Sequence, residues 1–405
     1  MTTTQYDLVI VGAGIQGAGI AQAASAQGYS VLILEQNEIA AGTSSRSSKL
    51  IHGGLRYLES GQFSLVRECL AERATLLKLA PELIKLKPFY FPIYKHSKRW
   101  PWQLYCGLTL YKMLGFFKKE VGFKKVPKSK WKDLDGLNTE ELKAVYQYWD
   151  AQTDDRALTK AVVASALELG STLHMPATLQ HADITTEGVN VEYHFQGNIH
   201  RCTAKILVNA AGPWCNEVIR KVLPVSPKLQ VDLVQGTHIL VNGLINEPMG
   251  DHIFYLESPS DRRPVFVMPW GKQIMVGTTE TPFHGVADDV VPLTEEKTYL
   301  LEVLSYYFPK FRLANTARTD SAFAGLRVLP TNPGSIHSRT RDTLLHLDNP
   351  KQPRLLTVYG GKLTAYRITA ERVVKQLKKH LPPRQRKAVV TDIKLTANPV
   401  INISQ

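Results

Sequence analysis

The stretch Tyr6-Asp7-Leu8-Val9-Ile10-Val11-Gly12-Ala13-Gly14-Ile15-Gln16-Gly17 decides the fold of this chain. It joins an apolar run to a Gly-x-Gly-x-x-Gly motif and to an alanine-rich segment that we expect to be helical as far as about Gln27. A second apolar run follows at Val31–Leu34 and ends at Glu35. A strand, a helix and a strand in this order are typical of a βαβ unit with parallel strands.

The three glycines of the motif each have a physical reason in a dinucleotide site. Gly12 permits a tight turn, Gly14 lets a pyrophosphate approach the backbone, and Gly17 lets the helix and the strand pack closely. The helix N-terminus offers unpaired N–H groups and a positive dipole end to phosphates. Glu35 would accept hydrogen bonds from ribose hydroxyls. A glycine-rich turn that binds no nucleotide is the alternative.

The loop that follows Glu35 favours FAD over NAD, which use the same opening motif. Residues 42–54 read Gly-Thr-Ser-Ser-Arg-Ser-Ser-Lys-Leu-Ile-His-Gly-Gly. A loop this rich in hydroxyl groups and closed by glycines can wrap a diphosphate and lie along a flavin ring, whereas an NAD enzyme normally has a plain helix there. The sequence therefore predicts FAD as the cofactor and no metal.

The rest of the chain alternates between the patterns of helices and strands. We expect helices at 155–169, 295–308 and 363–380, strands near 177, 189–195, 203–207 and 355–358, and a hairpin made of 266–270 and 273–279. We predict an α/β protein in which a Rossmann-like FAD-binding domain carries an inserted, mostly antiparallel, sheet-rich substrate domain. The expected boundaries are 1–80, 150–225 and 320–385 for the FAD-binding domain, 81–149 for a basic membrane-facing segment, 226–319 for the substrate domain and 386–405 for a C-terminal tail.

Composition excludes several classes of protein. With 405 residues, 44% hydrophobic and 21% charged, the chain is an ordinary globular one. The longest apolar stretch, 102–117, is interrupted by Lys112 and is shorter than the roughly 20 residues that span a bilayer. A secretory signal is not expected, because a strand begins at Tyr6. The scattered cysteines are expected to be unpaired thiols in a reducing cytosol: Cys69, Cys106, Cys202 and Cys215.

The net charge of +13 is concentrated in one window, residues 85–132, which holds thirteen lysines and arginines and one acid, Glu120. Aromatic residues alternate with these cations, and Leu104, Leu108, Tyr111 and Leu114 recur at helical spacing. These features predict a helix that lies in the headgroup plane of an anionic membrane. A core-packing helix with a solvated basic side is one alternative. Nucleic-acid binding is another, but no such motif accompanies the window, and we expect none.

Five stretches together resemble the FAD-dependent glycerol-3-phosphate dehydrogenases, within the D-amino-acid-oxidase-like flavoproteins. The stretches are 11–20, 43–58, 209–214, 266–270 with 276–279, and 360–367. The second, with Ser48-Lys49-Leu50-Ile51-His52-Gly53-Gly54, and the fifth are the most specific. The resemblance covers residues 6 to about 380. Family members usually continue into a C-terminal helical domain, which leaves the oligomeric state open here.

The resemblance implies a set of site residues. Gly325-Leu326-Arg327 departs slightly from the Gly-Val-Arg-Pro common in the family. The expected FAD contacts are Gly12, Gly14, Gly17, Glu35, Thr43, Ser44, Ser45, Ser48, Lys49, Leu50, His52, Ala210, Ala211, Gly212, Gly361, Lys362, Leu363 and Thr364. The expected substrate contacts are Arg56, Tyr57, His238, Arg327 and Arg341.

The residue types fit the oxidation of a phosphorylated alcohol. The guanidinium groups of Arg327 and Arg341 suit a phosphate clamp, because the planar fork pairs two oxygens at once. His238 is the candidate base for the hydroxyl proton, since imidazole titrates near neutral pH. Lys362 would stabilise negative charge on a reduced flavin. A core histidine, structural ion pairs and a solvated lysine are the alternatives for these residues.

The implied activity is the oxidation of sn-glycerol 3-phosphate to dihydroxyacetone phosphate by hydride transfer to FAD, with quinone as the electron acceptor. The implied location is the cytoplasmic side, peripherally attached to the inner face of the cell membrane. One alternative is an oxidase that uses oxygen, or an enzyme that acts on an amino acid or a 2-hydroxy acid. A non-catalytic dinucleotide-binding or membrane-scaffold protein is another.

Overall fold

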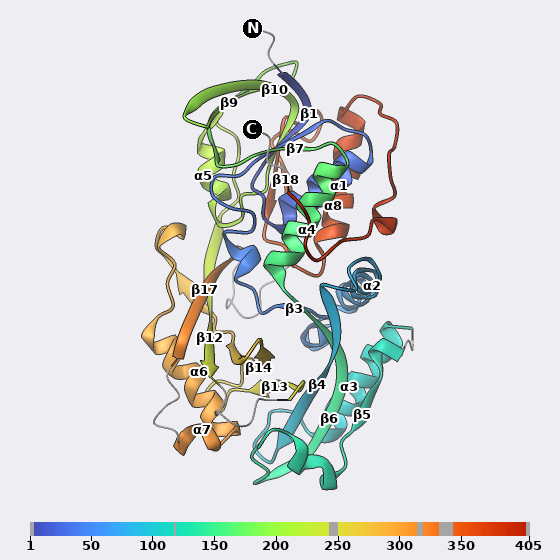
Figure 1. The fold of residues 1–405 in the computed structure, drawn as a ribbon, viewed down its shortest axis with the longest axis vertical. Helices are drawn as coiled ribbons and strands as arrows, with labels where there is room; N and C mark the ends of the chain where they lie inside the picture. The colour runs from blue at the N-terminus through green and yellow to red at the C-terminus, as the bar shows by residue number, and fades with distance from the viewer. Residues whose placement is uncertain (1–3, 117–118, 243–249, 314–318, 332–342, 402–405) are drawn as a thin grey trace.

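The computed structural model describes residues 4–116, 119–242, 250–313, 319–331 and 343–401. Figure 1 shows an elongated molecule, with one sheet and its helices in the upper half and a second sheet in the lower half. Both chain ends lie in the upper half. The chain crosses between the halves several times, so each half is assembled from distant parts of the sequence.

The first sheet has a parallel centre. β1 (Thr4–Val11) pairs in parallel with β2 (Val31–Leu34) and with β10 (Asn198–Asn209). The end of β10 also pairs in parallel with β19 (Leu355–Tyr359), and its beginning pairs antiparallel with β9 (Val189–Phe195). The other strands of this sheet are β7 (Thr172–His174), β8 (Ala177–Ile184), β11 (Val222–Leu223) and β18 (Leu344–Leu347).

The carboxyl ends of these parallel strands share one edge of the sheet, which is where ligands bind in such folds. The segments that leave this edge are the glycine motif after β1, Glu35 after β2, the Ala210–Gly212 loop after β10 and the Gly360–Gly361 turn after β19. Residues far apart in sequence therefore meet at one place.

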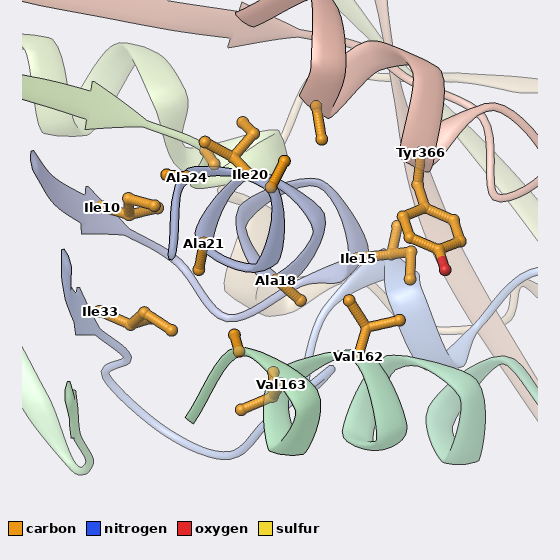
Figure 2. Close-up of a cluster of buried hydrophobic side chains, with 14 of the residues drawn as sticks. Ile10, Ile15, Ala18, Ile20, Ala21, Ala24, Ile33, Val162, Val163 and Tyr366 are labelled. Carbon is orange, nitrogen blue, oxygen red and sulfur yellow. The ribbon is translucent and has the colours of Figure 1, made fainter. Parts of the chain in front are cut away.

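Helix α1 (Ile15–Ala26) is buried on almost every side, because its residues are small or apolar all around. It lies between β1 and β2 on one side and α4 (Asp155–Glu168) and α8 (Tyr366–Leu377) on the other (Figure 2). An added Cβ at Gly17 would lie 1.9 Å from the carbonyl oxygen of Gly12, so close packing here requires glycine. The opposite face of the sheet is covered by α5 (Cys215–Arg220).

The second sheet is mostly antiparallel. Its strands, in spatial order, are β16 (Thr281–Phe283), β12 (Val231–Asn242), β15 (Gln273–Gly277), β14 (Pro264–Trp270), β13 (Ile253–Glu257), β4 (Ile84–Tyr94), β6 (Leu142–Thr153) and β3 (Leu50–Ile51). In addition, β17 (Thr319–Pro330) pairs with β12 and β5 (Phe123–Lys125) pairs with β6. One face packs against α6 (Thr294–Tyr307) and α7 (Lys310–Leu313), and the other against α3 (Pro101–Leu114), next to which lies α2 (Phe63–Leu79).

Short 3-10 turns connect these elements. They are η1 (Thr43–Ser45), η2 (Leu55–Leu58), η3 (Lys119–Val121), η4 (Lys128–Asp133), η5 (Gly212–Trp214), η6 (Ala287–Asp289), η8 (Lys378–His380) and η9 (Val390–Asp392). The four cysteines lie in the described part of the chain, and each is free.

The structure divides the chain differently from the expected boundaries in three places. β3, which lies in the range 1–80 expected for the FAD-binding domain, pairs with β6 in the second sheet. β17 belongs to the second sheet through its long antiparallel pairing with β12, although residues 320–385 were expected in the FAD-binding domain. The window 81–149 is not a separate segment either, since β4 and most of β6, which flank its basic part, are strands of the second sheet. In each place, pairing with a strand distant in sequence determines which sheet the segment joins.

Helix α3 corrects the expectation for the basic window. Leu104, Leu108 and Tyr111, which were expected to face lipid, are at most 4% exposed and pack inside the protein. The alternative of a core-packing helix is therefore right for this stripe. A different set of side chains on and beside α3 is exposed: Trp100, Trp102, Tyr105, Met113 and Phe116. Within the described residues, no helix has the length and apolar character needed to cross a bilayer.

Candidate active site

A cavity of about 410 Å³ opens at the carboxyl edge of the first sheet and extends to the second sheet. Its lining includes the glycine motif and Glu35 at one end, and Tyr255, Phe266 and Arg327 from the second sheet at the other. A cavity that reaches across both sheets has the form needed for a long dinucleotide whose reactive ring meets a substrate.

The N-terminus of α1 faces this cavity. Gly12 has a φ of +106°, and a Cβ there would lie 2.7 Å from the carbonyl oxygen of Ala210, so the turn requires glycine. Gly14 is the N-cap and supplies no side chain to the helix end. The N-terminal end of the helix dipole therefore points toward a site suited to phosphate.

Glu35 is 8% exposed and lines the cavity. Its Oε2 accepts a hydrogen bond from the backbone N–H of Ala13 (2.7 Å) and its Oε1 from that of Asn37 (2.9 Å). Burial raises the pKa of this carboxyl, while the backbone donors oppose the rise. Each carboxylate oxygen can accept a further bond, so the geometry leaves room for a ribose hydroxyl.

The hydroxyl-rich loop is tied to both neighbouring elements. Ser44 Oγ accepts from the N–H of Ile15 (2.9 Å), and Thr43 Oγ1 donates to the carbonyl oxygen of Leu326 on β17 (2.7 Å). The loop is thus held against the helix N-terminus on one side and against the second sheet on the other. Thr43 and Ser44 line the cavity.

The two most specific stretches of the sequence meet at the far end of the cavity. The N–H of His52 donates to Thr364 Oγ1 (3.2 Å), and the ammonium group of Lys362 lies 4.3 Å from the centre of the Tyr57 ring. All four residues line the cavity. The contact brings a hydroxyl-rich loop, an aromatic ring and a cation together, as binding of a flavin would require.

His238, on β12, is 2% exposed. Its ring stacks on Phe323 with 4.9 Å between centroids, and its Nε2 lies 2.9 Å from Ser48 Oγ. Burial, with the charges of Arg327 and Lys49, lowers the pKa of His238 to about 3, so the imidazole is neutral at neutral pH. Among the described residues, its Nδ1 has no hydrogen-bond partner.

Two arginines meet a carboxylate beside His238. Arg327 Nη1 donates to Glu280 Oε1 (2.9 Å), and Arg56 Nη1 lies 4.0 Å from the same oxygen. Arg327 Nη2 donates to Thr278 Oγ1 (3.2 Å). These side chains line the cavity, which places two guanidinium groups and a neutral imidazole at one end of it.

Most of the predicted site residues line the cavity, and among those that the structure describes three do not. The expected residues that line it are Gly12, Gly14, Glu35, Thr43, Ser44, Ser48, Leu50, His52, Arg56, Tyr57, Ala210, Ala211, Gly212, His238, Arg327, Gly361, Lys362, Leu363 and Thr364. Gly17 packs inside the βαβ unit, and Ser45 Oγ donates to its own loop. The ammonium group of Lys49 forms a buried ion pair with Asp155 instead. Arg341 lies outside the described residues.

Several residues of the site were not predicted from the sequence. Glu280 directly follows the Val276–Thr279 stretch that carried the resemblance, so the sequence pointed to its position. A carboxylate, however, is not a residue type that indicates a phosphate site. Arg263 lines the cavity from the start of the hairpin. Gln16 sits inside the glycine motif, where only the glycines had been considered.

The residues present fit FAD. The Oε1 of Gln16 is buried with no hydrogen-bond partner in the described structure, and Gln16 lines the cavity between the helix N-terminus and Lys362. An orphaned polar atom at this point fits a polar ligand edge. The glycine motif and Glu35 would hold the adenosine diphosphate part, and the loop of Ser48 with the turn of Lys362 would hold the flavin.

Comparison with known proteins agrees with this geometry. The family model described as FAD dependent oxidoreductase matches residues 7–367. The chain is 39% identical to the glycerol-3-phosphate dehydrogenase of Pseudomonas aeruginosa, over 92% of this chain and 71% of that protein. It is 36% identical to the D-erythritol 1-phosphate dehydrogenase of Brucella abortus, over 93% of this chain and 74% of that protein.

A solved structure has the same fold. The glycerol-3-phosphate dehydrogenase of Bacillus halodurans complexed with FAD aligns with a TM-score of 0.75 and 26% identity, covering 96% of this chain and 68% of that chain. The predicted α/β fold, cofactor and family are thereby confirmed. The chain belongs to the FAD dependent oxidoreductase family, within the group that includes the glycerol-3-phosphate dehydrogenases, and its cofactor is FAD.

Proposed function

We propose that this protein oxidises sn-glycerol 3-phosphate to dihydroxyacetone phosphate. The observation that carries the proposal is the pairing of two cavity-facing guanidinium groups, Arg56 and Arg327, with the buried neutral His238 at the end of the cavity where Lys362 meets Tyr57. When bound, FAD supplies the hydride acceptor for the alcohol carbon. The names of the relatives support the choice of substrate.

The arginines bind and orient the phosphate. Arg327 donates to Glu280, to Thr278 and to the carbonyl oxygen of Thr279, which fixes its guanidinium plane at the cavity wall. A planar guanidinium is the side-chain group whose geometry matches the oxygens of a phosphate. Charge-assisted bonds of this kind are shorter and stronger than neutral ones. Fixing the phosphate also fixes the adjacent carbinol carbon, which is the positioning that a hydride transfer needs.

His238 accepts the hydroxyl proton. Within the described part of the chain the Nδ1 of this neutral imidazole has no partner, so it offers a lone pair or a proton, depending on the tautomer that Ser48 selects through Nε2. The low pKa of His238 arises first from burial and then from the positive charges of Arg327 and Lys49. A phosphate dianion beside Arg327 offsets that charge and raises the basicity of the imidazole when substrate binds.

Lys362 stabilises the negative charge that the reduced cofactor acquires. Its ammonium group lies over the Tyr57 ring, 4.3 Å from the centroid, where a cation is attracted to the aromatic face. It follows the Gly360–Gly361 turn, where Gly361 has a φ of +127°. The turn and the ring together hold the charge at one position in the cavity, and a fixed charge acts without reorganisation.

The electron acceptor is a membrane quinone, with the protein attached peripherally to the inner face of the cell membrane. Support comes from one surface of the lower half, formed by α3 and the neighbouring β5, where the ring of Tyr105 meets that of Phe123 (Figure 1). The exposed aromatic residues on and beside α3 are Trp100, Trp102, Tyr105 and Phe116, and the exposed lysines before α3 and on β5 are Lys98, Lys124 and Lys125. Aromatic rings beside clustered ammonium groups suit an anionic lipid surface.

An acceptor-coupled assay tests the activity. Purified FAD-loaded protein is supplied with sn-glycerol 3-phosphate, D-erythritol 1-phosphate, glycine or 2-hydroxyglutarate, and with either a soluble quinone or oxygen. We expect dihydroxyacetone phosphate from glycerol 3-phosphate, with quinone reduced faster than oxygen is converted to hydrogen peroxide. Faster turnover of another substrate would reject the proposed substrate. Stoichiometric peroxide with no response to quinone would make the protein an oxidase.

A further inference from the structure

Glu280 places a carboxylate inside the cationic end of the cavity. It lies between β15 and β16, and its side chain is 8% exposed. Its Oε1 accepts from Arg327 Nη1 at 2.9 Å and is 4.0 Å from Arg56 Nη1. A negative charge at this position repels a phosphate, so its presence at a phosphate site calls for a compensating role.

The segment that contains Glu280 accepts hydrogen bonds from both terminal nitrogens of Arg327. Nη1 binds the carboxylate, while Nη2 donates to Thr278 Oγ1 (3.2 Å) and to the carbonyl oxygen of Thr279 (3.4 Å). An arginine side chain has many rotamers, and ordering it on binding has an entropic cost. A guanidinium that is already fixed avoids that cost when the ligand arrives.

The backbone of Glu280 is itself anchored by Arg263. Arg263 Nη1 donates to the carbonyl oxygen of Glu280 (3.0 Å), and Arg263 Nε pairs with Asp261 at 3.2 Å. The backbone that carries the carboxylate is therefore held by the β13–β14 connection. A carboxylate on an anchored backbone can hold the guanidinium groups of Arg327 and Arg56 in place.

The negative charge of Glu280 has a second effect on phosphate binding, opposite to the effect of its hydrogen bond to Arg327. Arg56, Arg263, Arg327 and Lys362 bring positive charge to this end of the cavity, and the carboxylate reduces the total by one. If repulsion dominated, removing the carboxylate would tighten anion binding. If orientation of the arginines dominated, removing it would weaken anion binding. The two effects can therefore be separated by substitution.

We infer that Glu280 is a positioning residue, which holds Arg327 and Arg56 in the orientation that binds the substrate phosphate. The inference rests on the function proposed above and adds a residue to it. Glutamine at this position keeps an acceptor oxygen at nearly the same place without the charge, whereas alanine removes the acceptor. Glutamine should therefore preserve the orientation of the arginines and alanine should not.

The test measures KM for sn-glycerol 3-phosphate, kcat, and the inhibition constant of inorganic phosphate in Glu280→Ala and Glu280→Gln. We expect Glu280→Ala to raise KM and the phosphate inhibition constant by roughly tenfold or more, as for a lost charge-assisted hydrogen bond, with a much smaller change in kcat. Glu280→Gln should stay within about threefold of the native protein. Glu295→Gln, an exposed position on α6, is the matched control.

A double-mutant cycle shows whether Glu280 acts through Arg327. In an Arg327→Ala background, Glu280→Ala should have little further effect on phosphate inhibition, because the residue that it orients is gone. If Glu280→Ala does not retain FAD, Glu280→Thr takes its place, since its side chain is too short to reach Arg327. Additive effects in the cycle would contradict the inference.

Other outcomes also decide the question. Phosphate binding that is unchanged or tighter in Glu280→Ala overturns the positioning role, and the tighter result identifies Glu280 as a repulsive charge. The native protein provides the separation from the proposed function. If native protein neither oxidises glycerol 3-phosphate nor is inhibited by phosphate, the proposed function itself fails, whatever the variants do.

Discussion

Ser48 Oγ lies 2.9 Å from Nε2 of His238, which joins the loop after the dinucleotide motif to β12 of the second sheet. The two residues are far apart in sequence and belong to different halves of the molecule. Both residues line the cavity, so their contact joins the cofactor loop to the candidate base at the cavity wall. The protonation state of His238 is therefore linked to the packing of the two halves.

The first prediction concerns pH and stability. The pKa of His238 is lowered to about 3 in the folded protein, from an ordinary value near 6.5. Between these values the unfolded chain binds a proton that the folded protein does not, so the free energy of unfolding falls as pH falls from about 6.5 toward 3. We expect this residue to contribute a loss on the order of 3 kcal/mol by about pH 4.

Denaturant unfolding of native protein and His238→Asn across this range measures the effect. The variant should lose less stability than native protein as pH falls below about 6.5, because it lacks the titrating imidazole. Equal pH slopes for the two proteins would show that His238 titrates normally in the folded state. The absolute stability of the variant at neutral pH is not the criterion, since the contact with Ser48 is also changed.

The second prediction concerns the phosphate clamp. Arg327→Ala should raise KM for sn-glycerol 3-phosphate by roughly 10–100-fold, the range expected for one lost bond to a charged group. FAD content should stay normal, because Arg327 contacts the Thr278–Glu280 segment of the second sheet. Arg201→Ala, at an exposed arginine on β10, is the control. Unchanged kinetics in Arg327→Ala would remove it from the clamp.

The third prediction concerns the βαβ unit. Gly17→Ala would put a methyl group 1.9 Å from the carbonyl oxygen of Gly12, and neither the helix that carries the methyl group nor the turn that carries the oxygen can move freely. We expect little soluble, FAD-containing protein, as measured by the ratio of flavin to protein absorbance. Gly107→Ala on α3 meets no atom within 4 Å and should fold with normal FAD content. Normal FAD content in Gly17→Ala would contradict the packing described here.

The fourth prediction concerns the membrane surface. Lys124→Glu with Lys125→Glu should weaken binding to anionic phospholipid vesicles by roughly 30-fold or more, since each cation near such a surface contributes about 1 kcal/mol. Lys378→Glu with Lys379→Glu changes the same charges on the exposed η8 and should bind as native protein does. Equal sedimentation of both double variants with vesicles would argue against this surface.

The parts of the fold that were predictable are those set by local sequence. The strand, glycine turn and helix from Tyr6 to Gln27 follow from apolar patterning and from glycine spacing, and the hairpin of β14 and β15 follows from two short apolar runs. Membership of a sheet is different, because it depends on pairing between distant strands. That is why β17 was expected in the wrong half.

The direction in which side chains point was harder to predict. Leu104 and Leu108 recur at helical spacing, which gives an apolar face but does not say whether protein or lipid covers it. In the structure, β4 and β6 supply the cover, and Trp102 remains outside. Lys49 was expected at the flavin, and its ammonium group forms a buried ion pair with Asp155. Such contacts depend on tertiary structure that no motif contains.

Reduction of the bound flavin by substrate, in the absence of oxygen and of any acceptor, tests the central claim most directly. The yellow FAD-loaded protein is mixed with sn-glycerol 3-phosphate, and the flavin absorbance band is followed in a stopped-flow instrument. The account predicts rapid and complete bleaching by glycerol 3-phosphate, and little by glycine or 2-hydroxyglutarate. A flavin that stays oxidised with glycerol 3-phosphate, or that bleaches faster with glycine, would contradict it.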